Sequence, residues 1–379
     1  MGLATAGATG DAPPLSPETE SLVWTAPSSS VAESMPLGNG KLGINVWADA
    51  TDTVWLLLSH VDALDENTNL DKLGRIKIQA LTSPAASAGG EARTAAQPFR
   101  QEMHLTNATV SIDLTSGVHV DVWVDATTDA VRVVSSGSLH KLEATLEVWR
   151  NATAPMDWCP GPNSTSRSDV CPQGELQGCA SLHPNLTLSA DVVEGKDAGV
   201  LFYHRNPDTE GWAIDLKSQQ MPPDLPSPMT NNTFGGFLTG GAGSKMARTT
   251  GMQLVSESAA TTQRLSVGGM AGHFDDGVAA FAAEVTAAAA KPASREAHEA
   301  VWSAFWAESD ITITAAASPA DAAVAASAAR VTLLDKVTRA ASHFMSRGLI
   351  SGIHSQAYGI FSAYDPPRED YRIWGPCQW

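Results

Sequence analysis

The feature that most constrains this chain is a series of short apolar runs separated by turn-forming residues. In the run Val118–Val124, valine occupies every second position, so the valines share one face of a strand. Many short strands at this spacing favour a large antiparallel β-sandwich of roughly 250 residues. We predict strands at Leu42–Trp47, Thr53–Ser59, Arg75–Ala80, Val118–Val124, Val131–Val134, Leu142–Trp149, Val200–Tyr203, Phe234–Thr239 and Leu265–Gly268.

The pattern changes after the last predicted strand, where alanine and glutamate become frequent. Asp276–Ala290 and Ser294–Ala307 are predicted helices, and Ser294 suits the N-cap of the second. Pro319 suits the first turn of a third helix, which Gly348 would end. We therefore expect a disordered tail at 1–20, a β-sandwich at 21–275 with a loop insertion at 151–184, a helical linker at 276–318 and further helical structure at 319–379.

Aromatic residues gather on one face of the second predicted helix. Trp302, Phe305 and Trp306 stand at i, i+3 and i+4, which places them side by side. At about 25 cal/mol per Å² of apolar surface, burying three such side chains stabilises a contact by several kcal/mol. This face is predicted to pack the linker against the domains on either side of it.

The chain of 379 residues has a net charge of −17, and this bounds its partners. Such a charge repels phosphate backbones, so nucleic-acid binding is not expected. No apolar run reaches the roughly 18 residues of a membrane-spanning helix, so a membrane partner is not expected either. Eleven Trp against four Tyr allow two interpretations: the indole rings stack on sugars, or they are simply large core residues.

Five Asn-x-Ser/Thr sequons are predicted glycosylation sites and indicate an extracellular protein or one in the secretory pathway. The first residues have neither the basic nor the apolar region of a signal peptide, so we expect the true start to lie elsewhere. The sequons begin at Asn107, Asn151, Asn163, Asn185 and Asn231.

Three cysteines, Cys159, Cys171 and Cys179, fall in one short stretch rich in Pro, Gly and Ser. Two of them could form a disulfide that staples this loop, as expected in an oxidising compartment. Their spacing does not provide the Cys-x₂-Cys pairs of a zinc site. Neither a metal nor a cofactor is predicted.

The most distinctive segment is Met35–Gly43, whose three glycines flank Asn39 and Lys41 and lead into a strand. Its physical interpretation is a tight turn with a positive φ angle at Gly or Asn. The glycines fit the Gly-x-Gly-x-x-Gly spacing of a dinucleotide site, but a strand follows where such a site needs a helix. Dinucleotide binding is therefore not predicted.

A second distinctive segment, Leu58–Asn67, holds His60, Asp62, Asp65 and Glu66 after an apolar strand. Such a group of side chains could face a ligand. The alternative is an ordinary solvated loop. The sequence leaves both interpretations open.

Several motifs follow one another in an order that resembles a known family. They are Trp24–Pro27, Met35–Gly43, Asn45–Trp47, Ser59–Asn67, Lys72–Lys77, Thr233–Leu238, Val301–Ser309, Gly359–Ser362 and Asp370–Gly375. Their order is similar to the N-terminal domain of unknown function 5703, which precedes a barrel related to glycoside hydrolase family 95. That enzyme family has a similar Pro-Leu-Gly-Asn-Gly-x-Leu-Gly opening.

The resemblance implies a β-supersandwich, a helical linker and an (α/α)₆ barrel of the six-hairpin glycosidase type. Residues 319–379 would then be the start of this barrel, which the chain leaves incomplete. Complete relatives are expected to hydrolyse α-L-fucosides and α-L-galactosides with inversion, using one carboxyl group as acid and another as base. The resemblance places both catalytic groups beyond Trp379, so no catalytic residue is assigned within the chain.

Acidic and basic residues near the end of the chain are predicted to form structural ion pairs or the edge of a pocket. The predicted pocket or interface residues are Asn39, Lys41, Asp62, Asp65, Glu66, Asp370, Arg372 and Trp374.

Two functions are compatible with the sequence. The first is the non-catalytic N-terminal part of a secreted glycoside hydrolase-like protein that acts on carbohydrate, with the sandwich packed on its own barrel. The second is a non-catalytic carbohydrate-binding or structural secreted glycoprotein.

Overall fold

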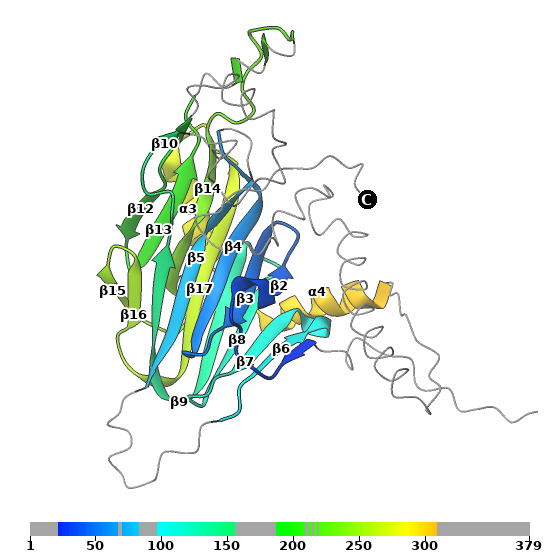
Figure 1. Cartoon of the computed structure of the whole chain (residues 1–379), viewed down its shortest axis with the longest axis vertical. Coiled ribbons are helices and arrows are strands. Elements are labelled where there is room, and N and C mark those ends of the chain that lie inside the picture. Colours follow the sequence, from blue (N-terminus) through cyan, green and yellow to red (C-terminus); the bar gives the residue numbers. More distant parts are fainter. Residues whose placement is uncertain are drawn as a thin grey trace, which may run out of the picture.

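Long antiparallel strands make up most of this computed structural model, and two α-helices follow them in sequence (Figure 1). The structure describes residues 22–66, 70–82, 97–155, 187–208, 212–213, 216–217 and 220–308. The strands are β1 Leu22–Trp24, β2 Met35–Gly38, β3 Leu42–Ala48, β4 Thr53–Leu64, β5 Leu70–Thr82, β6 Arg100–His104, β7 Thr109–Asp113, β8 Val118–Val124, β9 Ala130–Glu147, β10 Ala154–Pro155, β11 Thr187–Leu188, β12 Val192–Lys196, β13 Gly199–Arg205, β14 Asn232–Gly240, β15 Met246–Thr250, β16 Gln253–Ser256 and β17 Ala260–His273. The helices are the short 3-10 turns η2 Val31–Glu33 and η4 Leu105–Asn107 and the α-helices α3 Val278–Ala290 and α4 Arg295–Glu308.

The long strand β9 belongs to two parts of one curled sheet. Its first half pairs with β8 and β17, and its second half pairs with β5 and β16. One part therefore runs β1-β6-β7-β8-β9-β17-β14-β13-β12, and the other runs β2-β3-β4-β5-β9-β16-β15. Gly137, between the halves, has a φ of 128°, which side chains other than glycine rarely adopt. A Cβ atom there would also stand 2.6 Å from the carbonyl oxygen of Gly117.

The core lies between the two parts of the sheet, where β4 packs against β14 and β17. Alternate residues of each strand point into it, as the period of two predicts. Ile44, Leu56 and Ile76 come from one part, and Phe202 and Phe234 come from the other; all are at most 1% exposed. The prediction of a mainly β, antiparallel fold is confirmed.

Predicted strands differ from observed ones mainly in length. β8 begins and ends as predicted, and its valines point into the core. Val131–Val134 and Leu142–Trp149, predicted as two strands, are parts of the single strand β9, because a glycine lets one strand pass between both parts of the sheet. β4 continues to Leu64, through residues for which a solvated loop was one interpretation.

Helix α3 covers the outer face of β14 and β17. Phe281 and Val285 of the helix pack with Leu201 of β13 and Phe237 of β14, whose side chains point away from the core. Gly268 of β17 allows this close approach, because a Cβ atom there would lie 2.4 Å from the carbonyl oxygen of Val285.

Helix α4 begins as predicted, since the hydroxyl of Ser294 accepts a hydrogen bond from the amide of Ala297 at 3.1 Å. In Figure 1 this helix lies beside the end of the sheet that holds β6. Within the described part of the chain, no helix is long and apolar enough to cross a bilayer. The predicted third helix and barrel start, residues 319–379, lie outside the described residues.

Candidate functional site

Asn39 joins two turns of the sheet rather than facing solvent. Its Oδ1 accepts hydrogen bonds from the amides of Lys41 and Leu42 at 3.1 and 2.9 Å, which closes the β2–β3 hairpin. Its Nδ2 donates to the carbonyl of Asp125 at 3.1 Å. Gly40 has a φ of 97°, so the predicted tight turn with a positive φ is confirmed. The side chain of Lys41 is exposed.

The polar residues that follow Leu58 differ in how deeply they are buried. Asp62 is exposed, whereas His60, Asp65 and Glu66 are 3%, 1% and 6% exposed. The solvated-loop interpretation is therefore wrong for these three, because β4 carries the chain back into the sheet. His60 accepts a hydrogen bond from the amide of Asp62 through Nδ1 at 3.1 Å.

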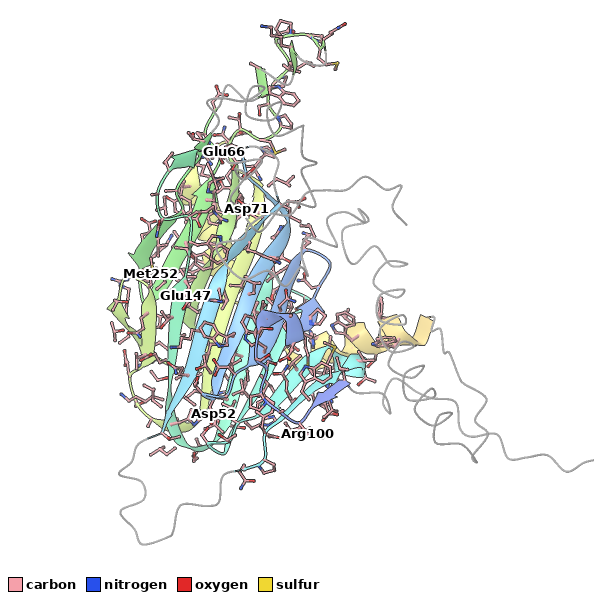
Figure 2. The ribbon with its side chains drawn as sticks, in the orientation of Figure 1. Asp52, Glu66, Asp71, Arg100, Glu147 and Met252 are labelled. Carbon is pink, nitrogen blue, oxygen red and sulfur yellow. The ribbon has the colours of Figure 1, made fainter. Side chains whose placement is uncertain are left out.

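Glu66 is part of a buried group of charges that we call the ionic cluster: Glu66, Asp71, Arg150, Asp191 and His204. His204 contacts Glu66 Oε2 through Nε2 at 2.8 Å and Asp191 Oδ1 through Nδ1 at 3.0 Å. Arg150 Nε donates to Asp191 Oδ1 at 2.7 Å and lies 3.4 Å from Asp71 Oδ2 through Nη1. Figure 2 shows Glu66 and Asp71 near the same end of the sheet. Each side chain in these ion pairs is at most 4% exposed.

Contacts within the ionic cluster favour the charged forms of His204 and Glu66. Burial would lower the pKa of His204, but its hydrogen bonds with Asp191 and Glu66 outweigh burial and raise it. Burial would likewise raise the pKa of Glu66, and the bonds from His204 and the amide of Ser189 instead lower it. His204 is thus favoured as a cation and Glu66 as an anion.

The ionic cluster stabilises the junction of four segments that are distant in sequence. Arg150 also donates to the carbonyl of Lys72 at 2.9 Å, and burial lowers the pKa of Lys72 to about 7. The Lys72 ammonium donates to Ser59 Oγ at 2.8 Å. A general acid must reach its substrate, and the nearly complete burial of Glu66 and His204 instead suits a structural ion pair. Among the described residues, no group of three His, Cys, Asp or Glu has the geometry to hold a metal ion.

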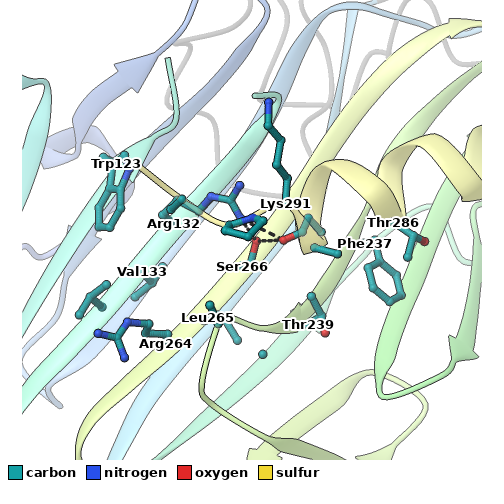
Figure 3. Close-up of a pocket in the computed structure, with 18 of the residues that line it drawn as sticks. Trp123, Arg132, Val133, Phe237, Thr239, Arg264, Leu265, Ser266, Thr286 and Lys291 are labelled. Atoms are coloured by element: carbon teal, nitrogen blue, oxygen red, sulfur yellow. Dashed lines mark hydrogen bonds between the residues drawn. The ribbon is translucent and has the colours of Figure 1, made fainter. Parts of the chain in front are cut away.

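A groove of about 730 Å³ lies on the opposite, outer side of the sheet, where the C-terminal end of α3 meets β9, β14 and β17 (Figure 3). We call it the α3 groove. Four cations line it against two carboxylates, in a chain whose net charge is −17. The cations are Arg132, Arg264, Lys291 and Arg295, and the carboxylates are Asp121 and Asp197.

Arg132 forms the inner wall of the groove and is 5% exposed. Its Nη1 donates to Ser266 Oγ at 2.6 Å and to the carbonyl of Ala289 at 2.9 Å, so it caps the C-terminal end of α3. Its Nε lies 3.4 Å from Asp125 Oδ2. Dashed lines in Figure 3 mark bonds at this junction. Arg132 is therefore a structural residue whose donors are already used.

Arg264 and Lys291 differ from Arg132 because both side chains are exposed. Within the described residues, neither side chain has an ion pair or a hydrogen bond. The backbone of Arg264 is fixed, since its amide donates to Ser244 Oγ at 2.8 Å and its carbonyl accepts from the amide of Gly241 at 2.9 Å. Figure 3 shows the two side chains on opposite sides of Ser266.

Trp123 and Arg295 close one end of the groove. The Arg295 guanidinium lies 4.8 Å from the centre of the Trp123 ring, and Trp123 is only 5% exposed. This Trp is therefore not a free platform for a sugar ring. On the helix side, the buried Oγ1 of Thr286 has no hydrogen-bond partner in the described structure. Arg295 Nε also donates to Glu299 at 2.6 Å.

The predicted linker face lies against the end of the sheet. Trp302 and Phe305 are each 3% exposed, and Trp306 Nε1 donates to the carbonyl of Leu105 at 2.6 Å. His298, one turn earlier, contacts the carbonyl of Asn107 through Nε2 at 2.8 Å. Helix α4 therefore contacts the η4 turn, and through Arg295 and His298 it also contacts Trp123 of β8 and the amide of Ala126.

The sequons that the structure describes differ in accessibility. Asn151 is exposed. The Oδ1 of Asn107 is buried, and the side chain of Asn231 bonds Arg205 and Asp275. The remaining predicted residues lie outside the described residues: Asn163, Asn185, Cys159, Cys171, Cys179, Asp370, Arg372 and Trp374.

Sequence reasoning missed the ionic cluster and the α3 groove. Arg150, Asp191 and His204 have no shared spacing that would group them with Glu66, because only the strand order brings them together. The same holds for Arg264 and Lys291, which come from a strand and the residue after a helix.

Comparison with known protein families gives a match for most of the chain. No curated protein matches the chain at a significant level. A family model described as a domain of unknown function (DUF5703) matches residues 23–311, which is more than half of the chain and includes every strand from β2 to β17 and both α-helices. The chain therefore belongs to the DUF5703 family.

Proposed function

We propose that this chain is the non-catalytic, β-rich N-terminal part of a secreted glycoside hydrolase-like protein, and that its sheet binds carbohydrate in the α3 groove. Membership of the DUF5703 family supports the β-rich N-terminal domain of this proposal. The glycoside hydrolase-like part rests on the resemblance of the late segments to a six-hairpin barrel, and the secretory route rests on the sequons. Hydrolysis in complete relatives would fall to the barrel, by inversion between an acid and a base.

The chemistry of the α3 groove supports carbohydrate binding and is the observation that carries this proposal. Ala242, Ala290 and Pro292 give it exposed apolar surface, and Thr239 brings a hydroxyl group to the same space. A pyranose presents an apolar face of C–H groups and an edge of hydroxyls, so it matches both kinds of surface.

Binding and turnover by the whole chain test the proposal. The purified protein is titrated against a panel of neutral and acidic oligosaccharides, and each is then assayed for released sugar. We expect saturable binding to at least one glycan with no turnover. If none of the glycans binds saturably, carbohydrate binding is overturned and a structural glycoprotein is favoured. Turnover by the chain would overturn the non-catalytic assignment.

The location of the contact is tested by a change in the groove. Thr239→Val keeps the shape of the side chain and removes its hydroxyl, so it should weaken glycan binding. The matched control is Thr262→Val, because Thr262 lies on β17 and does not line the groove. Equal binding by both variants would contradict the groove as the site.

A further inference from the structure

We infer that the α3 groove selects an acidic saccharide, a short oligomer of uronic acid whose carboxylates meet Arg264 and Lys291. This inference rests on the proposed carbohydrate binding and adds the chemical class of the ligand. It uses two cations that the folded structure leaves available.

The cations of the ionic cluster and of the α3 groove fall into two groups. Arg132 and Arg150 are buried and bonded to carboxylates, and Arg295 is bonded to Glu299. Arg264 and Lys291, in contrast, have no carboxylate within ion-pair distance among the described residues. An exposed charge held at a groove is free to pair with an incoming anion at little cost in broken contacts.

The carboxylates of the groove do not neutralise these two cations. Asp121 accepts hydrogen bonds from Ser111 Oγ at 2.6 Å and from His119 Nε2 at 3.2 Å. These partners and the charge of Arg295 outweigh burial and keep the pKa of Asp121 low. Asp197 lies on the exposed turn between β12 and β13. The α3 groove is therefore locally positive on a strongly acidic protein.

Local packing positions Arg264 before any ligand arrives. A Cβ atom at position 241 would lie 2.7 Å from Arg264 Cβ, so only glycine lets the two backbones come this close. Bonds to Gly241 and Ser244 fix the arginine backbone. Preorganisation of this kind lowers the entropy lost on binding.

The arrangement of the two cations favours an oligomer over a single sugar. Arg264 and Lys291 lie on opposite sides of Ser266 in Figure 3, with exposed apolar Ala290 and Pro292 among the lining residues. A ligand with acidic groups on more than one unit can meet both cations at once. Sugar rings between those groups would cover the apolar lining, which a simple anion would leave exposed.

Matched acidic and neutral ligands test the inference with the full chain. The probe is linear tetragalacturonate, and its methyl ester is the neutral control with the same sugar rings. Binding is measured by isothermal titration calorimetry at low and physiological salt. We expect the acid to bind at least ten-fold more tightly than the ester, with a difference that shrinks as salt rises.

Variants then assign the effect to the groove. Arg264→Gln combined with Lys291→Gln should weaken binding of the acid about ten-fold or more and leave binding of the ester unchanged. Arg100→Gln, an exposed cation of β6 that does not line the groove, should change neither. Circular dichroism confirms that each variant is folded.

The outcomes separate the two proposals. Equal binding of acid and ester, or acid binding unchanged in the double variant, would overturn the acidic ligand and leave carbohydrate binding standing. No binding of these or of any other glycan would overturn both. A tetraglutamate peptide could also bind as tightly as tetragalacturonate, with the same dependence on Arg264 and Lys291. That result would show that the groove recognises charge alone, and it would overturn the saccharide assignment.

Discussion

The ionic cluster and the α3 groove use the same kinds of side chain in opposite ways. In the cluster, Arg150 and His204 are buried and each meets carboxylates within 3.4 Å. In the groove, Arg264 and Lys291 are exposed, and the described structure offers them no such partner. Charge that is enclosed and balanced fixes the fold, whereas charge left open at a groove is available to a ligand.

The largest expected effect is the loss of one partner from the cluster. Arg150→Met should lower the free energy of unfolding by about 3–5 kcal/mol, because it leaves Asp71 and Asp191 buried with less compensation. Urea denaturation measures this change. The control, Arg75→Met, removes a half-exposed pair with Glu147 and should cost less than about 1 kcal/mol. If both variants lost the same free energy of unfolding, the buried pair and the half-exposed pair would contribute equally, which would contradict this account.

A smaller effect is expected where α3 meets the sheet. Gly268→Ala places a Cβ atom against the carbonyl of Val285, so it should push α3 outward and destabilise the protein by about 1–3 kcal/mol. Because α3 forms one wall of the groove, ligand binding should weaken too. Gly251→Ala meets nothing within 4 Å and serves as the control. Unchanged ligand binding in Gly268→Ala would show that binding in the groove does not depend on the position of α3.

Two histidines should give opposite dependences of stability on pH. Burial lowers the pKa of His60 to about 3, so the unfolded chain takes up a proton below about pH 6.5 and the folded chain does not. The wild type therefore loses stability as the pH falls, by about 1 kcal/mol at pH 5.5. His60→Asn keeps a side-chain acceptor for the amide of Asp62. The stability of this variant should therefore fall less than that of the wild type as the pH decreases.

His119 is the matched contrast on the other face. Its hydrogen bonds with Asp121 and Asp113 raise its pKa to about 9. Its contribution is complete below about pH 6.5 and is lost as the pH rises toward 9. His119→Asn should therefore flatten the alkaline limb and leave the loss of stability between about pH 6.5 and about pH 5 unchanged. Denaturation curves from acid to alkaline pH check both variants, and a changed slope between about pH 6.5 and about pH 5 in His119→Asn would contradict the assignment.

The smallest expected effect belongs to the open cations. Arg264→Gln should change the free energy of unfolding by no more than about 0.5 kcal/mol, because its side chain has no partner to lose within the described structure. Urea denaturation beside the Arg150→Met variant provides the test. A loss of several kcal/mol would mean that Arg264 is a structural residue.

Residue patterns were enough to predict the strands but not the charged regions. Alternating valines predicted β8, and Ser294 marked the start of α4, because local geometry alone decides both. The long strand β9 was divided in two, since a glycine bend cannot be told from a turn by pattern. The ionic cluster and the α3 groove arise only from strand order, which brings together residues as distant as Glu66 and His204.

Hydrogen exchange of the full chain with and without tetragalacturonate tests most directly whether the two charged regions have different roles. We predict slower exchange in peptides that contain Gly240–Gly241, Arg264 and Lys291, with exchange around Glu66 and His204 unchanged. Protection confined to the ionic cluster, with none at the α3 groove, would contradict the account.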